Sequence, residues 1–261
     1  MVETNHHIPN EEWPLIKKFN LLQSLSHDEI DVLMKLHEQE IIIDANKTFI
    51  YQKSVRRKCF IVNSGWACRF LNHSNGARQI IEYYLPGDII SPFALVMPKA
   101  NYSVSSISCL HVSVFKPDAL IDLCTAQPKL ALRYLAMLGW QDAMFVDLAT
   151  GIGWRTAYQR TAYFLLNLFE RLKLVEKTVG NTFFAPLTQQ MLADTLGLSI
   201  VHMNRTIKKL REDELIKIES NLVKLLDLVR LIQVAEYQSF YWRKTQQSSS
   251  TGRHQRDAIL H

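Results

Sequence analysis

Hydrophobic residues between positions 40 and 115 fall in short runs rich in Ile, Val, Phe and Tyr, and turn residues separate these runs. The runs are EIII, TFIYQ, KCFIVNSG, WACRFL, RQIIEYYL, DIISP, YSVSSIS and HVSVF. Asn75-Gly76 lies between two of them and is a strong hairpin signal, while Ser64-Gly65 and Pro86-Gly87-Asp88 indicate further reversals. Many short strands at this spacing predict a β-sandwich or a β-roll.

The chain before these strands has helical character. Residues 19–36 contain leucines and isoleucines around Ser26-His27-Asp28-Glu29, where Ser26 and Glu29 have the spacing of a capping box. We therefore expect a short helical entry there, preceded by a flexible N-terminus over residues 1–18.

Residues 186–218 have the pattern of two helices joined by a tight turn. Thr188 and Ser199 are suited to cap the two helices, which makes Gln189 the first residue of the first helix. Gly197 supplies the left-handed backbone that a helix end requires. The apolar positions expected to face inward are Leu192, Ala193 and Leu196 in the first helix and Met203, Ile207 and Leu210 in the second.

The second helix would carry donors and cations on its outward face, opposite the apolar stripe. Such a face suits a recognition helix that enters DNA. The alternative is an ordinary solvated helix whose charges only keep it soluble. The Gly-containing turn with capping residues at both starts favours DNA binding. The candidate DNA-binding residues are Thr188, Gln189, Ser199, Ile200, Val201, His202, Asn204, Arg205, Lys208 and Lys209.

Residues 214–228, ELIKIESNLVKLLDL, follow the second helix and read as a short β-hairpin around a polar Glu219-Ser220-Asn221 turn. The whole stretch is then a winged helix. LTQQMLADTLGLS, NRTIKKL and ELI resemble the DNA-binding domain of the Crp/Fnr family, bacterial transcription regulators with a β-roll sensor domain, a long dimer helix and a C-terminal winged helix. The resemblance extends over residues 19–231 and is most specific in the helix-turn-helix.

The resemblance implies roles for single residues. Arg205 matches the arginine that in this family contacts a guanine or its neighbouring phosphate. Val201, however, stands at the family's glutamate position, and Ile200 stands where many members carry a polar reader. His202 and Asn204 resemble a variant recognition helix and are the candidates for an altered readout. The family also implies RNA polymerase as a partner.

Residues 129–149, preceded by Pro128, have an apolar stripe that is too wide for one surface of an ordinary helix. We expect one side to pack on the β-roll and the other to meet a second copy of the chain, because paired recognition helices read two-fold DNA sites. A helix buried wholly within its own subunit is the alternative. The expected dimer contacts are Leu130, Tyr134, Met137, Leu138, Gln141, Met144, Phe145 and Leu148.

Gly151-Ile152-Gly153 interrupts this pattern and is expected to be a hinge, since glycine is costly inside a helix. Residues 154–175 then read as another amphipathic helix, similar to the first helix of the family's DNA-binding domain. Residues 240–261 are rich in Ser, Gln, Arg and His, and are expected to be a disordered basic tail.

Composition and charge fit this division of the chain. With 261 residues, 48% of them hydrophobic, and only 9 Gly and 8 Pro, the chain has enough apolar surface for two modest domains. Residues 1–153 hold 14 Lys and Arg against 15 Asp and Glu, whereas residues 154–261 hold 16 against 10. The net charges of −1 and +6 predict that the C-terminal part meets a polyanion. No apolar run has the length of a membrane span, so a cytoplasmic protein is expected.

The loop at residues 91–106, SPFALVMPKANYSVSS, bears on the effector. Nucleotide-binding members of the family carry Gly-Glu and then Arg followed by Ser or Thr in this segment, which hold the cyclic phosphate. The loop has neither, and its single cation is Lys99. We therefore expect no binding of cyclic nucleotides. The resemblance also argues against an iron-sulfur sensor, because family members that sense oxygen this way carry clustered cysteines near the N-terminus, and no cysteine precedes Cys59 here.

No catalytic or metal site is expected from the sequence. The four cysteines have no CxxC spacing, and buried reduced thiols are the preferred interpretation. Cys109 and His111 are two apart in a predicted strand and would share a face, but such a pair is only half of a metal site. The histidines also lack the His-x-His spacing of a catalytic cupin, so we expect neither a cofactor nor an enzyme.

These observations predict an α+β protein with an N-terminal β-roll, similar to a jelly-roll cyclic-nucleotide-binding domain, over residues 19–127. A dimerisation helix and hinge are expected at 128–153 and a winged helix-turn-helix domain at 154–239. The predicted function is that of a homodimeric regulator that binds palindromic double-stranded DNA and responds to an unidentified signal at the β-roll. The alternative is a sensor or protein-interaction module with a degenerate helix-turn-helix.

Overall fold

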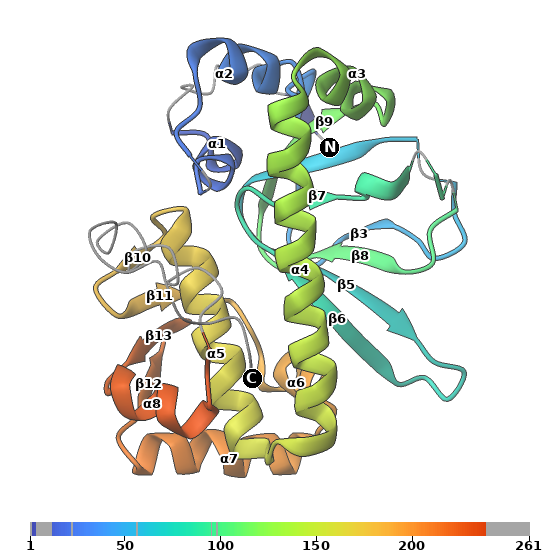
Figure 1. Cartoon of the computed structure of the whole chain (residues 1–261). Coiled ribbons are helices and arrows are strands. Elements are labelled where there is room, and N and C mark those ends of the chain that lie inside the picture. Colours follow the sequence, from blue (N-terminus) through green and yellow to red (C-terminus); the bar gives the residue numbers. More distant parts are fainter. Residues whose placement is uncertain are drawn as a thin grey trace, which may run out of the picture.

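The structure is a computed structural model that describes residues 2–3, 12–21, 23–55, 57–94, 96–97 and 99–238. The long helix α4 (Pro128–Trp154) runs through the middle of the molecule, with a β-roll domain on one side and a C-terminal helical domain with a small sheet on the other (Figure 1). This is the α+β architecture predicted from the sequence. Within the described residues, no helix is both long enough and apolar enough to cross a membrane.

The β-roll consists of two sheets, and every predicted apolar run between residues 40 and 115 contributes one strand. The first sheet has the order β1 (Val2–Glu3), β2 (Gln39–Ile43), β9 (Leu110–Phe115), β4 (Cys59–Ser64) and β7 (Ile89–Ile90). The second has the order β3 (Thr48–Ile50), β8 (Ser103–Ser106), β5 (Ala67–Asn72) and β6 (Arg78–Tyr84). Val62, Val104 and Val112 are fully buried in the core that the two sheets share. A 3-10 turn (Pro92–Ala94) and helix α3 (Asp118–Ala126) complete the domain.

The expectation of a flexible N-terminus over residues 1–18 is wrong for its last part. Helix α1 (Pro14–Phe19) begins with Pro14 at its first turn, and Trp13 and Leu15 are fully buried against the β-roll. The indole Nε1 of Trp13 donates a hydrogen bond to Asn63 Oδ1 at 2.9 Å. Burial of these apolar side chains is what orders the segment. Helix α2 (His27–Met34) follows, and its predicted capping box between Ser26 and Glu29 is present.

Helix α4 does not stop at Gly151-Ile152-Gly153, so the predicted hinge at these residues is also wrong. The helix continues to Trp154, and the chain first leaves helical geometry at Arg155. Arg155 is held in place because its guanidinium donates to the carbonyl oxygen of Asp147 at 3.0 Å and lies 4.3 Å from the centre of the Tyr163 ring. Thr156 then caps the next helix. The break between the domains is therefore the pair Arg155 and Thr156.

The C-terminal domain has the winged-helix arrangement that the sequence predicts. Its helices are α5 (Ala157–Leu174), α6 (Gln189–Leu196), α7 (Ile200–Glu212) and α8 (Leu228–Ala235). Its antiparallel sheet has the order β10 (Thr178–Val179), β11 (Thr182–Phe184), β13 (Leu222–Leu225) and β12 (Ile216–Glu219). The hairpin of β10 and β11 and helix α8 were not anticipated. The predicted tail at residues 240–261 lies outside the described residues.

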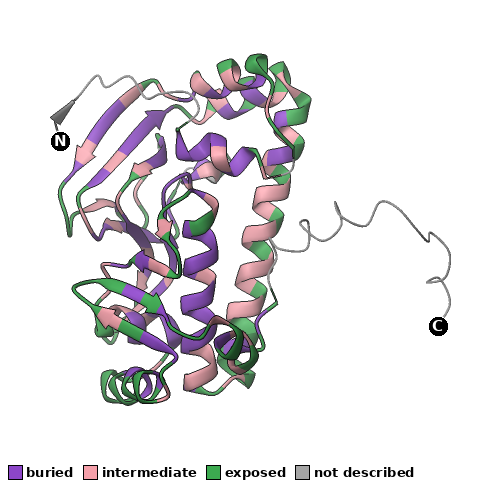
Figure 2. Ribbon diagram, turned by 90° about the vertical axis from the view of Figure 1, so that its left-hand side faces the viewer, coloured by how far each residue is buried: buried purple, intermediate pink, exposed green. Residues whose placement is uncertain are grey.

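The two domains share one hydrophobic core. Trp66, Ile80 and Tyr83 of the β-roll belong to the same buried cluster as Phe164 and Leu192 of the C-terminal domain. Figure 2 shows α5 buried over most of its length, while the residues of α4 beside it are mostly intermediate or exposed. The C-terminal domain is thus packed against the β-roll rather than held by a free linker.

Candidate nucleic-acid interface

Helices α6 and α7 form the predicted helix-turn-helix. The hydroxyl of Thr188 accepts a hydrogen bond from the backbone N–H of Met191 at 3.1 Å, and the hydroxyl of Ser199 accepts one from His202 at 3.2 Å. Gly197 has φ 63° and ends α6 in the left-handed conformation. Because the caps and the glycine fix both helix ends, the angle between α6 and α7 is set locally.

Helix α7 buries one face and exposes the other. Met203, Ile207 and Leu210 are buried beneath it, as the stripe predicts. The ten candidate DNA-binding residues all lie on the surface of α7 or at the start of α6: Thr188, Gln189, Ser199, Ile200, Val201, His202, Asn204, Arg205, Lys208 and Lys209. All ten side chains are exposed, and we call the exposed face of α7 together with the exposed start of α6 the α7 surface.

The three cations of the α7 surface differ in their surroundings. Lys208 lies 3.6 Å from Glu212, and Lys209 lies 3.2 Å from Asp213. Hydrogen bonds from Tyr158 and Lys209 hold the pKa of Asp213 below its usual value. Within the described part of the chain, Arg205 has no ion-pair or hydrogen-bond partner, so its guanidinium needs no internal bond to be broken before it binds an external acceptor.

The hairpin of β12 and β13 forms the wing next to α7. Ser220 and Asn221 connect the two strands with φ angles of 48° and 66°. Two consecutive residues in this region are typical of the tight hairpin turns that match the twist of the flanking strands. The exposed side chain of Lys217 points from β12 and pairs with Glu219 at 3.0 Å.

Helix α4 has two apolar stripes, and the structure assigns them to different surfaces. Most of the residues predicted as dimer contacts face the protein's own domains: Tyr134, Met137, Leu138, Gln141, Met144, Phe145 and Leu148 are half-buried and line cavities between α4 and the neighbouring elements. Leu130 is fully buried against the N-terminal helices and cannot contact a partner. The expectation is therefore corrected for Leu130 alone. The other seven side chains pack in part within the subunit, and their contact with a second copy stays a prediction.

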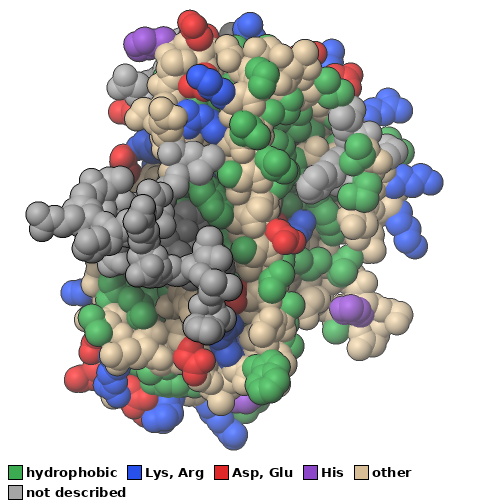
Figure 3. Space-filling model, in the orientation of Figure 1, with side chains coloured by type: hydrophobic (Ala, Val, Ile, Leu, Met, Phe, Trp, Pro, Cys, Tyr) green, Lys and Arg blue, Asp and Glu red, His purple; other side chains and the backbone are tan. Residues whose placement is uncertain are grey.

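The exposed stripe of α4 runs along the opposite side. Leu132, Leu135 and Val146 are 67%, 64% and 59% exposed, and Figure 3 shows hydrophobic side chains along the face of this helix. The positions of this stripe alternate three and four residues apart and are Leu132, Leu135, Gly139, Asp142, Val146, Ala149 and Gly153. Asp142 lies at the edge of the stripe, because it also lines the cavity between α4 and the β-roll. This spacing is the one that pairs two helices in a coiled coil. We call it the outer stripe.

Helix α6 is docked on the β-roll through strand β6. The Tyr83 hydroxyl lies 2.7 Å from the Thr195 hydroxyl, and the side chain of Gln79 donates to the Thr195 carbonyl oxygen at 3.2 Å. Arg78 pairs with Asp194 at 2.8 Å. Sequence reasoning missed these contacts, because nothing in the spacing of residues 112 to 116 positions apart in the chain indicates that they meet. They fix the helix-turn-helix relative to the β-roll.

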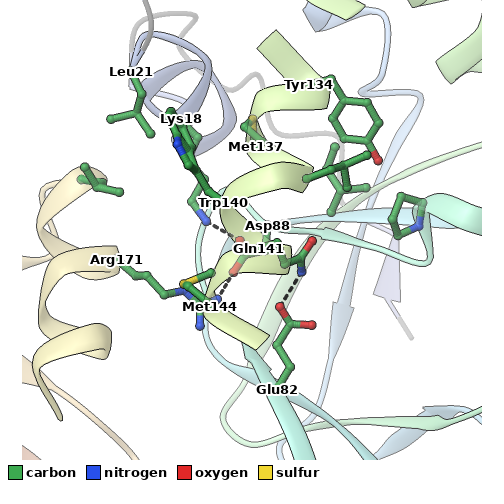
Figure 4. Close-up of a pocket in the computed structure, with 14 residues that line it drawn as sticks. Lys18, Leu21, Glu82, Asp88, Tyr134, Met137, Trp140, Gln141, Met144 and Arg171 are labelled. Carbon is green, nitrogen blue, oxygen red and sulfur yellow. Dashed lines mark hydrogen bonds and ion pairs between the residues drawn. The ribbon is translucent and has the colours of Figure 1, made fainter. Parts of the chain in front are cut away.

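A second polar cluster lies where α1, α4, α5 and β6 meet (Figure 4). Asp88 accepts from Lys18 and from Arg171, the latter at 2.8 Å, while Gln141 of α4 donates to Glu82. Burial alone would raise the pKa of Asp88, but Lys18 and Arg171 outweigh it and hold the pKa below its usual value. The cluster joins the C-terminal domain to the turn Pro86-Gly87-Asp88.

A cavity of about 220 Å³ lies between the β-roll and α4. Its arginine, Arg69, lies 3.1 Å from Glu82 and between the rings of Tyr102 and Phe145, at 5.1 and 4.6 Å from their centres. The other charged residue among the described lining residues is Asp142. The positive charge of the cavity is therefore already neutralised by a buried carboxylate.

The cysteines differ in part from the expectation of buried thiols. Cys59 and Cys68 are buried, whereas Cys109 is exposed and lies just before β9, outside the strand that holds His111. His111 lies 3.7 Å from Glu40 instead of facing a thiol. Among the residues that the structure describes, no group of three or more His, Cys, Asp or Glu side chains is arranged to hold a metal ion.

Comparisons with known proteins agree with this arrangement. The model of the Crp-like helix-turn-helix domain matches residues 159–234, and that of the cyclic nucleotide-binding domain matches residues 40–127. The chain is 30% identical to the nitrogen fixation regulation protein FixK of Bradyrhizobium diazoefficiens over 161 residues, which cover 62% of this chain and 67% of that protein. It is 32% identical to the transcriptional activatory protein AadR of Rhodopseudomonas palustris over 163 residues, covering 62% and 66%.

The fold is also that of a solved relative. The structure of FixK2 from Bradyrhizobium japonicum superimposes with a TM-score of 0.67 at 21% identity, over 77% of this chain and 98% of the other. The β-roll, the long helix and the winged helix are therefore found in the same order in a known structure. With both domain models matched and a relative that is 30% identical over 67% of its length, the chain belongs to the Crp/Fnr family and is a DNA-binding transcription regulator.

Proposed function

We propose that this regulator binds palindromic double-stranded DNA as a homodimer, with one α7 surface in each half-site. The observation that carries the proposal is the exposed α7 surface itself, on which Arg205 has no partner among the described residues. A guanidinium that is not engaged within the protein suits bidentate bonding to a guanine in the major groove. His202 and Asn204, exposed beside it, supply further donors, and this His-x-Asn-Arg arrangement is proposed to set the readout.

The proposed dimer forms through the outer stripe of α4. Leu132, Leu135 and Val146 expose apolar area that water solvates unfavourably, and their three-and-four spacing allows a second α4 to cover it. Two copies related by a two-fold axis would place their α7 surfaces symmetrically, which is what a palindromic site requires.

The proposed signal acts at the β-roll, and it is not a cyclic nucleotide. A cyclic phosphate needs an unpaired cation, but Arg69 in the cavity is paired with Glu82, and Asp142 adds further negative charge. The loop at residues 91–106 also lacks the family's phosphate-binding residues. RNA polymerase is proposed as the protein partner on the strength of the family alone.

The test is selection of bound sequences from a random DNA pool by the purified protein. Enrichment of a palindrome supports both DNA reading and the two-fold arrangement. Enrichment of a single asymmetric half-site would contradict the dimer. Failure to enrich any sequence, while the protein remains folded, would instead favour an interaction module with a degenerate helix-turn-helix.

A further inference from the structure

The recognition helix begins with two apolar residues that the protein core does not use. Val201 is 55% exposed and Ile200 is 37% exposed, although the rest of the outward face of α7 is polar or charged. A scattered apolar side chain on a surface is ordinary. These two, however, occupy the first turn of the helix directly after the Ser199 cap, and the N-terminal residues of a recognition helix are the ones that reach base edges.

The position of Val201 relative to Arg205 narrows what it can touch. The two residues are four apart and so lie on the same face of α7, separated by about 6 Å along the helix axis. Base pairs are stacked about 3.4 Å apart. If Arg205 contacts a guanine, Val201 lies over a base one or two steps away.

The major groove has only one apolar group for such a side chain to meet, the C5-methyl group of thymine. Valine has neither a donor nor an acceptor with which to recognise the polar edges of the other bases. We propose that Val201, supported by Ile200, reads a thymine methyl group one or two base pairs from the guanine contacted by Arg205. This inference rests on the proposed function, in which α7 enters the major groove.

The experiment removes the methyl group from the DNA and its partner from the protein. Each thymine of the selected operator is replaced in turn by deoxyuridine, which lacks only the C5-methyl group, and binding is measured by fluorescence anisotropy. The wild type should lose about four-fold in affinity per half-site at one thymine, as expected for the loss of one buried methyl group. Val201→Ala should bind the thymine and deoxyuridine operators equally. Val229→Ala, an exposed valine of α8, is the matched control and should behave as the wild type.

A second variant tests specificity rather than affinity. Val201→Glu should move the preference at this position from thymine towards cytosine, whose amino group a carboxylate can accept from. The proposal is overturned if no thymine replacement weakens the wild type. It is equally overturned if Val201→Ala keeps the full sensitivity to deoxyuridine, since the methyl contact then lies elsewhere. If the wild type bound no DNA sequence specifically, the proposed function would fail, and that result is distinguishable from a failure of the Val201 assignment.

Discussion

Replacing Leu135 by Ala should weaken the dimer about 30-fold while leaving the fold intact. Complete burial of a leucine side chain stabilises by about 1.5–3 kcal/mol. Leu135 is 64% exposed in the single chain, so about 1–2 kcal/mol remains to be gained when a partner covers it. Because the interface is two-fold, each substitution removes two leucine side chains from the dimer, whereas the alanines that replace them retain part of the contact. A loss of about 2 kcal/mol per dimer corresponds to about 30-fold in the dissociation constant.

Sedimentation equilibrium over a range of protein concentrations measures this constant. The matched control is Met137→Ala, which removes a side chain of the opposite stripe that faces the protein's own cavity. We expect Met137→Ala to lower the free energy of unfolding but to keep the wild-type dimer constant. The opposite pattern, a normal dimer for Leu135→Ala and a weakened one for Met137→Ala, would refute the assignment of the two stripes.

Three further outcomes are expected. Arg205→Ala should reduce the free energy of DNA binding by about 1–3 kcal/mol and relax the preference at one base position. Lys209→Ala should weaken binding to all operators alike and lower the slope of affinity against salt concentration by about one unit or less, because Asp213 already offsets the charge of Lys209. Binding of both variants to operator variants at several salt concentrations would check these outcomes. Cyclic AMP and cyclic GMP should neither bind in calorimetric titrations nor tighten DNA binding, and micromolar affinity for either would contradict this. Asp88→Asn should lower the free energy of unfolding, measured by urea denaturation, by about 3 kcal/mol. Because the pKa of Asp88 is depressed in the folded protein, its stabilisation is present above the usual carboxyl pKa and is lost as the pH falls through the depressed value, so the variant's stability should depend less on pH at the acid end.

The parts of the fold that the sequence predicts well depend on local signals. Alternation and turn residues locate the strands, since the side-chain direction of a strand follows directly from its period of two. Capping residues and Gly197 locate the helix-turn-helix within one or two residues. The exposed α7 surface follows from the buried stripe, because a helix that buries one face must expose the other.

The sequence could not show which of the two apolar stripes of α4 packs within the subunit, because both stripes have the same spacing. Only the tertiary contacts, such as the hydrogen bond from Gln141 to Glu82, show which stripe the subunit uses itself. The end of α4 was misplaced for a related reason. The cost of Gly151 and Gly153 is about 1 kcal/mol each, and the capping box of Thr156 and the contacts of Arg155 favour a later break. Trp13 was overlooked because its acceptor, Asn63, lies 50 residues away in the chain.

The arrangement of strand β6 explains how events at the β-roll can reach the helix-turn-helix over a short path. Side chains of adjacent strand residues point to opposite faces. Glu82 accordingly contacts Arg69 in the cavity and Gln141 of α4, while the next residue, Tyr83, contacts Thr195 of α6 and accepts a hydrogen bond from Arg171 of α5 through its backbone oxygen at 2.7 Å. A ligand that displaced Glu82 would therefore act on the neighbouring residue Tyr83, whose backbone oxygen is bonded to α5 and whose hydroxyl is bonded to α6. Since buried hydrogen-bonded contacts are costly to leave unmade, we expect such a movement to shift α6 as a unit, and α7 with it through the tight turn at Gly197.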